Sequence, residues 1–184
     1  MLSALLGFLI AVTGSAQAYI ENAKTPLCFR GDTQLNIDNR QVLTWKSTSK
    51  NQYTTQAYIS GVMEGSLTNS NSHYRFMVRL GDGPKDIIEV VYNNKFGSMP
   101  KLEEGMEITI CGEYITSNAP TQRYQPSPAG AIIHWVHQNP GDRKGSANHP
   151  HGFIMVNGST LIGFDTAKTG AWDGELSGYK PGER

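Results

Sequence analysis

Residues 102–112, LEEGMEITICG, decide the fold of this 184-residue chain. Gly105 marks a turn, and the residues that follow it alternate between apolar and polar side chains. This alternation has the period of a β-strand, so we expect a strand over residues 106–116. A turn that leads directly into a long strand is typical of a strand that helps to close a small β-barrel.

The flanking sequence supplies four further barrel strands. Three precede the quoted passage, at residues 56–67, 73–80 and 86–92, and the last follows it at residues 130–137. Asn157-Gly158 then predicts a hairpin between strands at 152–156 and 159–164. Strands in this order, with Gly61 inside the first, favour an all-β fold with a small OB-like antiparallel barrel over residues 56–164. Another small antiparallel barrel or a sandwich is the alternative.

The first 18 residues are typical of a secretory signal peptide. Residues 2–12, LSALLGFLIAV, form an apolar core too short to span a bilayer, and the small residues Ala16 and Ala18 suit cleavage before Tyr19. No Lys or Arg precedes this core, so an uncleaved N-terminal anchor is the alternative. We expect export to the bacterial periplasm or the medium, with no transmembrane segment in the mature chain.

The balance of acidic and basic residues limits which kinds of binding partner we expect. The chain holds 16 basic and 16 acidic residues, so its formal net charge is zero. Nucleic-acid binders normally show a net basic face, and this balance counts against one. Outside the barrel we expect an irregular lead-in at residues 19–55 and a flexible, Gly-rich tail at residues 165–184.

Cys28 and Cys111 are the only two cysteines of the chain. In an exported protein, a single pair favours a disulfide. Such a bridge would tie the lead-in to the strand that carries Cys111, and it would stabilise the fold by roughly 4–5 kcal/mol in the chain-entropy model. Two separate buried thiols are the alternative.

Four of the five histidines lie within residues 134–151. His134 and His137 belong to the expected strand at 130–137, and His149 and His151 follow the next loop. Imidazoles brought together in this way are typical ligands of zinc or another divalent transition metal. Residues three apart face opposite sides of a regular strand, so His134 and His137 can share an ion only where the strand ends or bulges.

The favoured arrangement places His137 opposite His149, with His134 or His151 as the third ligand. Asp142 is a candidate oxygen ligand or a residue that orients an imidazole. A structural hydrogen-bond cluster, with His134 packed beside Trp135, and a solvated loop are the alternatives. The histidine spacing matches neither a zinc finger nor an H-E-x-x-H helix.

Residues 130–154 resemble the DUF3465 family of exported bacterial proteins. The matching positions are Gly130, Ile132, His134, Trp135, His137 and Pro140, followed by His149, Gly152, Phe153 and Ile154. The resemblance extends over the barrel strands from about residue 56, but not over the lead-in or the tail. The chain departs from the family pattern in a longer loop and in His151, which favours His134, His137 and His149 as ligands. The family carries no established activity, so the resemblance implies a fold and a compartment.

The leading hypothesis is an exported OB-like binding module whose histidine-rich rim holds a metal ion or a small polar ligand. The alternative is a metal-dependent hydrolase of the phosphodiesterase or nuclease type, in which Arg143 or Arg123 stabilises developing charge. The histidine motif contains no Glu to act as acid or base, and this favours binding over catalysis.

A third hypothesis is a binder of single-stranded nucleic acid or polysaccharide. Its stacking platform would comprise Tyr58, Tyr74, Phe76 and Tyr92, although their phase with apolar residues assigns most of them to the core. Scattered carboxylates are expected to be solvated rather than catalytic: Asp82, Asp86, Glu89, Glu103 and Glu104.

Overall fold

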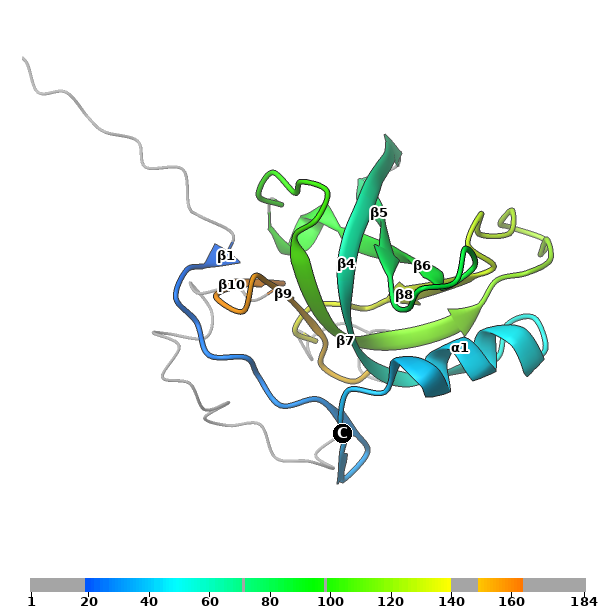
Figure 1. Cartoon of the computed structure of the whole chain (residues 1–184), viewed down its shortest axis with the longest axis horizontal. Helices are drawn as coiled ribbons and strands as arrows, with labels where there is room; N and C mark the ends of the chain where they lie inside the picture. The colour runs from blue at the N-terminus through cyan, green and yellow to red at the C-terminus, as the bar shows by residue number, and fades with distance from the viewer. Residues whose placement is uncertain (1–18, 71, 98, 140–148, 164–184) are drawn as a thin grey trace, which may run out of the picture.

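The computed structural model describes residues 19–70, 72–97, 99–139 and 149–163. They form a closed five-stranded barrel with one α-helix and several short strands outside it (Figure 1). The barrel strands are β4 (Thr54–Ser70), β5 (His73–Arg79), β6 (Ile87–Asn93), β7 (Glu107–Thr116) and β8 (Ala131–His134). The predicted signal peptide at 1–18 and the predicted tail at 165–184 lie outside the described residues.

The strand order around the barrel is β7-β4-β5-β6-β8, and β8 pairs with β7 to close the ring. Neighbouring strands are antiparallel, except for β6 and β8, which are parallel. Numbered along the chain, the barrel strands follow the order 1-2-3-5-4-1, the Greek-key arrangement of OB barrels. The OB-like fold predicted from the sequence is therefore confirmed.

Strand β7 has two different neighbours along one edge. Residues 108–111 pair with β9 (Phe153–Val156), whereas residues 113–116 pair with β8. The sheet continues from β9 to β10 (Thr160–Ile162) and then to β1 (Tyr19–Ile20). Asn157 and Gly158 both have positive φ and turn the chain between β9 and β10, as the Asn-Gly pair predicts.

Helix α1 (Asn39–Thr48) lies against β4 and β7, within the segment that the sequence indicates to be irregular. Asp38 caps the helix by accepting a hydrogen bond from the Gln41 amide at 2.9 Å. Val42 enters the barrel core, and the ring of Trp45 lies 5.5 Å from that of Tyr114. The helix thus belongs to the same core as the barrel. No helix in the described ranges is long and apolar enough to cross a membrane.

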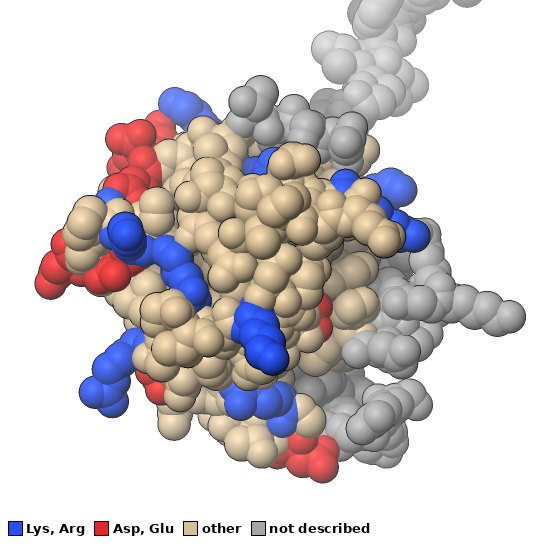
Figure 2. Space-filling model, turned by 90° about the vertical axis from the view of Figure 1, so that its right-hand side faces the viewer, with Lys and Arg blue, Asp and Glu red and all other residues tan. Residues whose placement is uncertain are grey.

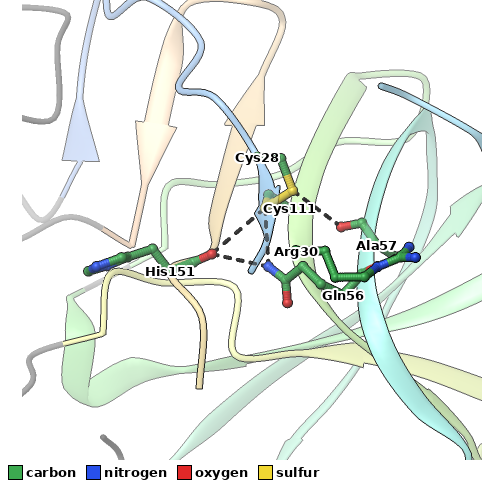
Figure 3. The surroundings of a disulfide bond; sticks show 6 residues. All are labelled: Cys28, Arg30, Gln56, Ala57, Cys111 and His151. Atoms are coloured by element: carbon green, nitrogen blue, oxygen red, sulfur yellow. Dashed lines mark hydrogen bonds between the residues drawn. A yellow bond between two sulfur atoms is a disulfide. The ribbon is translucent and has the colours of Figure 1, made fainter. Parts of the chain in front are cut away.

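Cys28 and Cys111 form a disulfide, as predicted. Cys28 precedes the short hairpin of β2 (Phe29–Arg30) and β3 (Thr33–Gln34), so the bridge fastens the lead-in to β7. Figure 3 shows the buried Gln56 amide beside the disulfide, where it donates to Cys111 Sγ at 3.3 Å and to the His151 carbonyl at 3.1 Å. Lead-in, barrel and the His151 segment therefore meet at one buried point.

Glu89 is not solvated, so that expectation is wrong. Its carboxylate is fully buried and accepts hydrogen bonds from Arg75 and, at 2.6 Å, from Ser127 Oγ. Ser127 belongs to the connection between β7 and β8, so the buried carboxylate fastens this long loop to β6. A buried carboxylate needs such partners because water no longer solvates it.

Candidate functional site

The histidine-rich segment begins where β8 ends. The sequence predicts a strand as far as His137, but β8 stops at His134 because Trp135 adopts a left-handed conformation with φ of 54°. This conformation is uncommon for a residue other than glycine, and strained residues cluster at functional sites. After the bend, Val136 is fully buried in the barrel core and His137 is 3 % exposed.

Three glycines hold the 134–137 segment in place by close backbone approach. A Cβ on Gly112 would lie 2.7 Å from the His134 carbonyl oxygen, one on Gly152 would lie 2.1 Å from that of Trp135, and one on Gly163 would lie 2.6 Å from that of Val136. Two hydrogen bonds complete the packing, from the Gly152 amide to the His137 carbonyl and from the Gln138 amide to the Gly163 carbonyl. Larger residues at these positions would push the segment away from β7 and β9.

The predicted ligands gather around the indole of Trp135 rather than around one free point. His149 stacks on the indole with a centroid distance of 3.8 Å and an interplanar angle of 17°. The ring centroids of His134 and His137 lie 4.7 and 5.8 Å from it. We call these four residues, Trp135, His134, His137 and His149, the histidine–tryptophan cluster.

His137 is held by one stacked ring face and by one nitrogen. Its imidazole stacks on Phe96, with centroids 3.4 Å apart, and Phe96 belongs to the short 3-10 helix η1 (Asn94–Phe96) after β6. Nδ1 lies 2.8 Å from the Gln138 carbonyl oxygen, which can only accept, so Nδ1 carries the proton. Nε2 is then an acceptor, and it is buried without a hydrogen-bond partner among the described residues.

His134 likewise has a buried Nε2 with no hydrogen-bond partner in the described part of the chain. The ring of His73, from the start of β5, lies 5.7 Å away. Burial lowers the pKa of His134 to about 4, helped by repulsion from His73, His137 and His149. Burial also lowers the pKa of His137 to about 4, against the opposing effect of its bond to Gln138. Both imidazoles are therefore neutral at neutral pH.

His151 is placed differently from the other three. Its Nδ1 accepts a hydrogen bond from the Asn139 amide at 3.1 Å, so in the neutral ring Nε2 carries the proton. Neither nitrogen then offers a free lone pair to an ion. The Asn139 side chain also donates to the His149 carbonyl, and together these bonds fasten residue 139 to the chain on the far side of the loop.

Glu113 was not part of the predicted site, yet the structure places it there. It is the register partner of His134 on β7, and its Oε2 lies 3.8 Å from His149 Nδ1. Burial raises the pKa of this carboxyl, and the attraction of His149 opposes the shift. Strand alternation could have identified Glu113 as an outward-facing residue, but only the register shows that it faces the histidines. His73 and Phe96 were missed for the same reason.

The described residues contain no group of three or more His, Cys, Asp or Glu side chains arranged to hold a metal ion. Asp142 and Arg143, two of the predicted site residues, lie outside the described residues, and Arg123 is exposed in the connection between β7 and β8. Zinc binding by His134, His137 and His149 accordingly stays a prediction. The geometry offers two buried imidazole nitrogens without hydrogen-bond partners in the described ranges, and for His137 the Nδ1 bond leaves the Nε2 lone pair free.

The aromatic platform of the third hypothesis is at most partly exposed. Phe76 and Tyr92 are fully buried in the barrel, Tyr74 is partly buried against Phe76, and Tyr58 packs edge-on against Phe153. Figure 2 shows one face of the molecule, on which Lys and Arg side chains are scattered among uncharged residues rather than joined into a basic groove. Phe76 and Tyr92 are therefore not available for stacking in this structure, and binding of single-stranded nucleic acid or polysaccharide stays a prediction.

Neither a family model nor a curated protein matches this chain. The resemblance of residues 130–154 to the DUF3465 family therefore stays a prediction.

Proposed function

We propose that this protein is an exported OB-like binding module that holds a metal ion or a small polar ligand at the histidine–tryptophan cluster. The observation that carries the proposal is the pair of buried nitrogens, His134 Nε2 and His137 Nε2, which lack hydrogen-bond partners among the described residues. Buried polar atoms in folded proteins are nearly always satisfied, so two such atoms in one cluster indicate a ligand.

The chemistry of the two nitrogens favours a bound cation. Each ring is neutral at neutral pH, because burial lowers both pKa values to about 4. The bond from His137 Nδ1 to a backbone carbonyl is the outer contact that metal-binding histidines usually make, and it directs the Nε2 lone pair toward the ligand. Imidazole nitrogens are preferred ligands of zinc, copper and nickel.

Burial also limits the size of the ligand. Both Nε2 atoms are inaccessible to solvent, so an extended sugar or nucleotide cannot reach them without a rearrangement of the cluster. A single ion or a molecule about the size of water fits this restriction. The Cys28–Cys111 disulfide supports the exported location, because disulfides persist mainly in oxidising compartments.

Calorimetric titration of the untagged protein with zinc chloride at pH 7 tests the proposal. We expect saturable binding that weakens about tenfold or more in His137→Gln, which corresponds to at least about 1.4 kcal/mol. His151→Gln is the matched control and should bind like the parent, because the His151 lone pair is already used by Asn139. Absence of binding in the parent, or equal weakening in both variants, would overturn the proposal.

One observation favours the hydrolase as a second candidate. Glu113 lies 3.8 Å from His149 and has a raised carboxyl pKa, so it supplies the acid–base residue that the histidine motif itself lacks. The test is release of 4-nitrophenolate from bis(4-nitrophenyl) phosphate in the presence of zinc. Turnover that falls at least tenfold in Glu113→Gln would favour the enzyme, and no turnover in the parent would leave the binding module alone.

A further inference from the structure

A separate pocket of about 320 Å³ lies between the lead-in, helix α1 and the start of β4. Residues 34–38 form one wall, and none of the lining residues belongs to the histidine–tryptophan cluster. Its lining is mixed: Leu35, Ile37, Val42, Trp45, Ala57 and the ring of Tyr58 are largely apolar, and Arg30, Gln34, Asn36, Asp38 and Gln41 are polar. The volume is at the lower end of the range for small-molecule sites, and the mixed lining suits a small molecule that has both an apolar and a polar part.

Arg30 is the cationic group of this pocket. Its guanidinium lies 5.5 Å from the centroid of the Trp45 ring, and its Nη2 donates to the Gln56 carbonyl at 3.0 Å. These contacts orient the guanidinium. Because the group carries five N–H donors, other donors remain available to a ligand. Arg30 makes no ion pair within 4.0 Å with a carboxylate of the described residues, and its positive charge is unneutralised at that range.

The wall of the pocket is fixed by covalent and hydrogen bonds. The disulfide fastens Cys28 to β7, and the Leu35 amide, near the start of the wall, donates to the Cys28 carbonyl at 2.8 Å. At its other end the Asp38 amide donates to the Tyr58 carbonyl at 3.0 Å, while the Asp38 side chain is engaged in capping α1. A pocket held at both ends needs little ordering when a ligand enters, and this favours affinity.

We propose that this pocket binds a small molecule that has an apolar body and a carboxylate. The apolar body contacts Trp45, Leu35 and Ile37, and the carboxylate accepts hydrogen bonds from Arg30. Arginine suits this role because its planar donors match the two oxygens of a carboxylate. Asp38 lines the same pocket, so the ligand is either a simple carboxylate or the zwitterion of an apolar amino acid, and the two differ only in an added ammonium group.

Calorimetric titration of the intact, oxidised protein with 3-phenylpropionate and with L-phenylalanine tests the proposal. We expect saturable binding of at least one probe, and the tighter of the two identifies the ligand type. Binding should weaken about tenfold or more in Arg30→Gln. Arg40→Gln is the matched control, because Arg40 is exposed on α1 and does not line the pocket. No saturable binding of either probe, or an equal loss in both variants, would overturn the proposal.

A second comparison needs no variant and covers the case in which Arg30→Gln misfolds. 3-Phenylpropanol has the same apolar body as 3-phenylpropionate but lacks the carboxylate. If the parent protein binds the alcohol at least about tenfold more weakly than the acid, recognition of the carboxylate is supported. Equal affinity for alcohol and acid would overturn it. Reduction of the disulfide should abolish binding of 3-phenylpropionate. Unchanged binding after complete reduction would contradict the claim that the disulfide holds the wall of the pocket in place.

Discussion

The Cα of Gly152 packs directly against the backbone carbonyl of Trp135, so closely that a Cβ on Gly152 would lie 2.1 Å from that oxygen. On another side the same Cβ would lie 2.6 Å from the Cys111 carbonyl oxygen. Both neighbours are backbone atoms, which cannot move aside as the end of a long side chain can. The contact therefore fixes the distance between the Trp135 backbone and β7. It thereby also positions the histidine–tryptophan cluster.

Replacement of Gly152 by alanine should accordingly destabilise the fold by about 1–3 kcal/mol, the usual cost of overpacking. Urea unfolding followed by circular dichroism measures this loss. Gly65→Ala is the control, because its Cβ would meet only Glu104 Oε1 at 3.7 Å. Similar losses in both variants would contradict the close approach at Gly152.

Removal of the disulfide should lower the free energy of unfolding more than either glycine substitution does. The bridge closes a loop with a sequence separation of 83, for which the chain-entropy model gives roughly 4–5 kcal/mol. We expect the Cys28→Ala/Cys111→Ala variant to lose a comparable amount in urea unfolding relative to the oxidised parent. Equal stability of the variant and the oxidised parent would show that the bridge contributes nothing.

Stability should fall as the pH decreases from about 6.5 toward 4. Burial lowers the pKa of both His134 and His137 to about 4, so the unfolded chain binds more protons than the native protein in this range. The shift from 6.5 to about 4 corresponds to roughly 3 kcal/mol for His137, at 1.4 kcal/mol per unit. The lowered pKa of His151 acts in the same direction, and the raised pKa of Glu113 opposes it.

Urea unfolding at pH 7.0, 5.5 and 4.5 measures this dependence. His137→Leu removes one of the two strongly shifted groups, so its stability should fall less steeply over the same range. A parent protein whose free energy of unfolding is constant between pH 7.0 and 4.5, or a variant with an unchanged slope, would contradict the buried neutral state of His137.

Glu89→Gln should destabilise the barrel. The substitution removes the charge that accepts hydrogen bonds from Arg75 and Ser127, and charged hydrogen bonds of this kind contribute about 1.5–3 kcal/mol. Glu103→Gln is the matched control, because the pair of Glu103 with Lys101 is exposed to solvent and should make no measurable contribution. Thermal unfolding that ranks the two variants in the opposite order would show that the buried carboxylate is not a structural anchor.

The barrel could be predicted from the sequence because its strands alternate cleanly. The period-2 pattern around Phe76, Val90 and Ile108 marks the inward faces, and Asn157-Gly158 marks a turn. The bounds of helix α1 could not be predicted because Val42 is its only fully buried residue, which leaves too weak a hydrophobic stripe to detect. The end of β8 was placed too late because nothing in the sequence around Trp135 signals a left-handed residue.

The site was predicted only in part, for a geometrical reason. The histidines at 134, 137 and 149 are close in sequence, so the motif itself draws attention to them. Glu113, His73 and Phe96 come from β7, β5 and the segment after β6, and only the barrel register brings them near the cluster. A motif of neighbouring residues cannot identify partners on other strands, because strand pairing joins residues that are far apart in the sequence.

The most direct test of the account is a histidine ring ¹H–¹⁵N correlation spectrum at pH 7, recorded before and after addition of zinc chloride. The structure places the proton of His137 on Nδ1 and that of His151 on Nε2. Zinc should shift the Nε2 resonances of His137 and His134 and leave His151 unchanged. Reversed tautomers, or zinc-induced shifts confined to His151, would contradict the claim that the buried Nε2 atoms of His134 and His137 form the binding site.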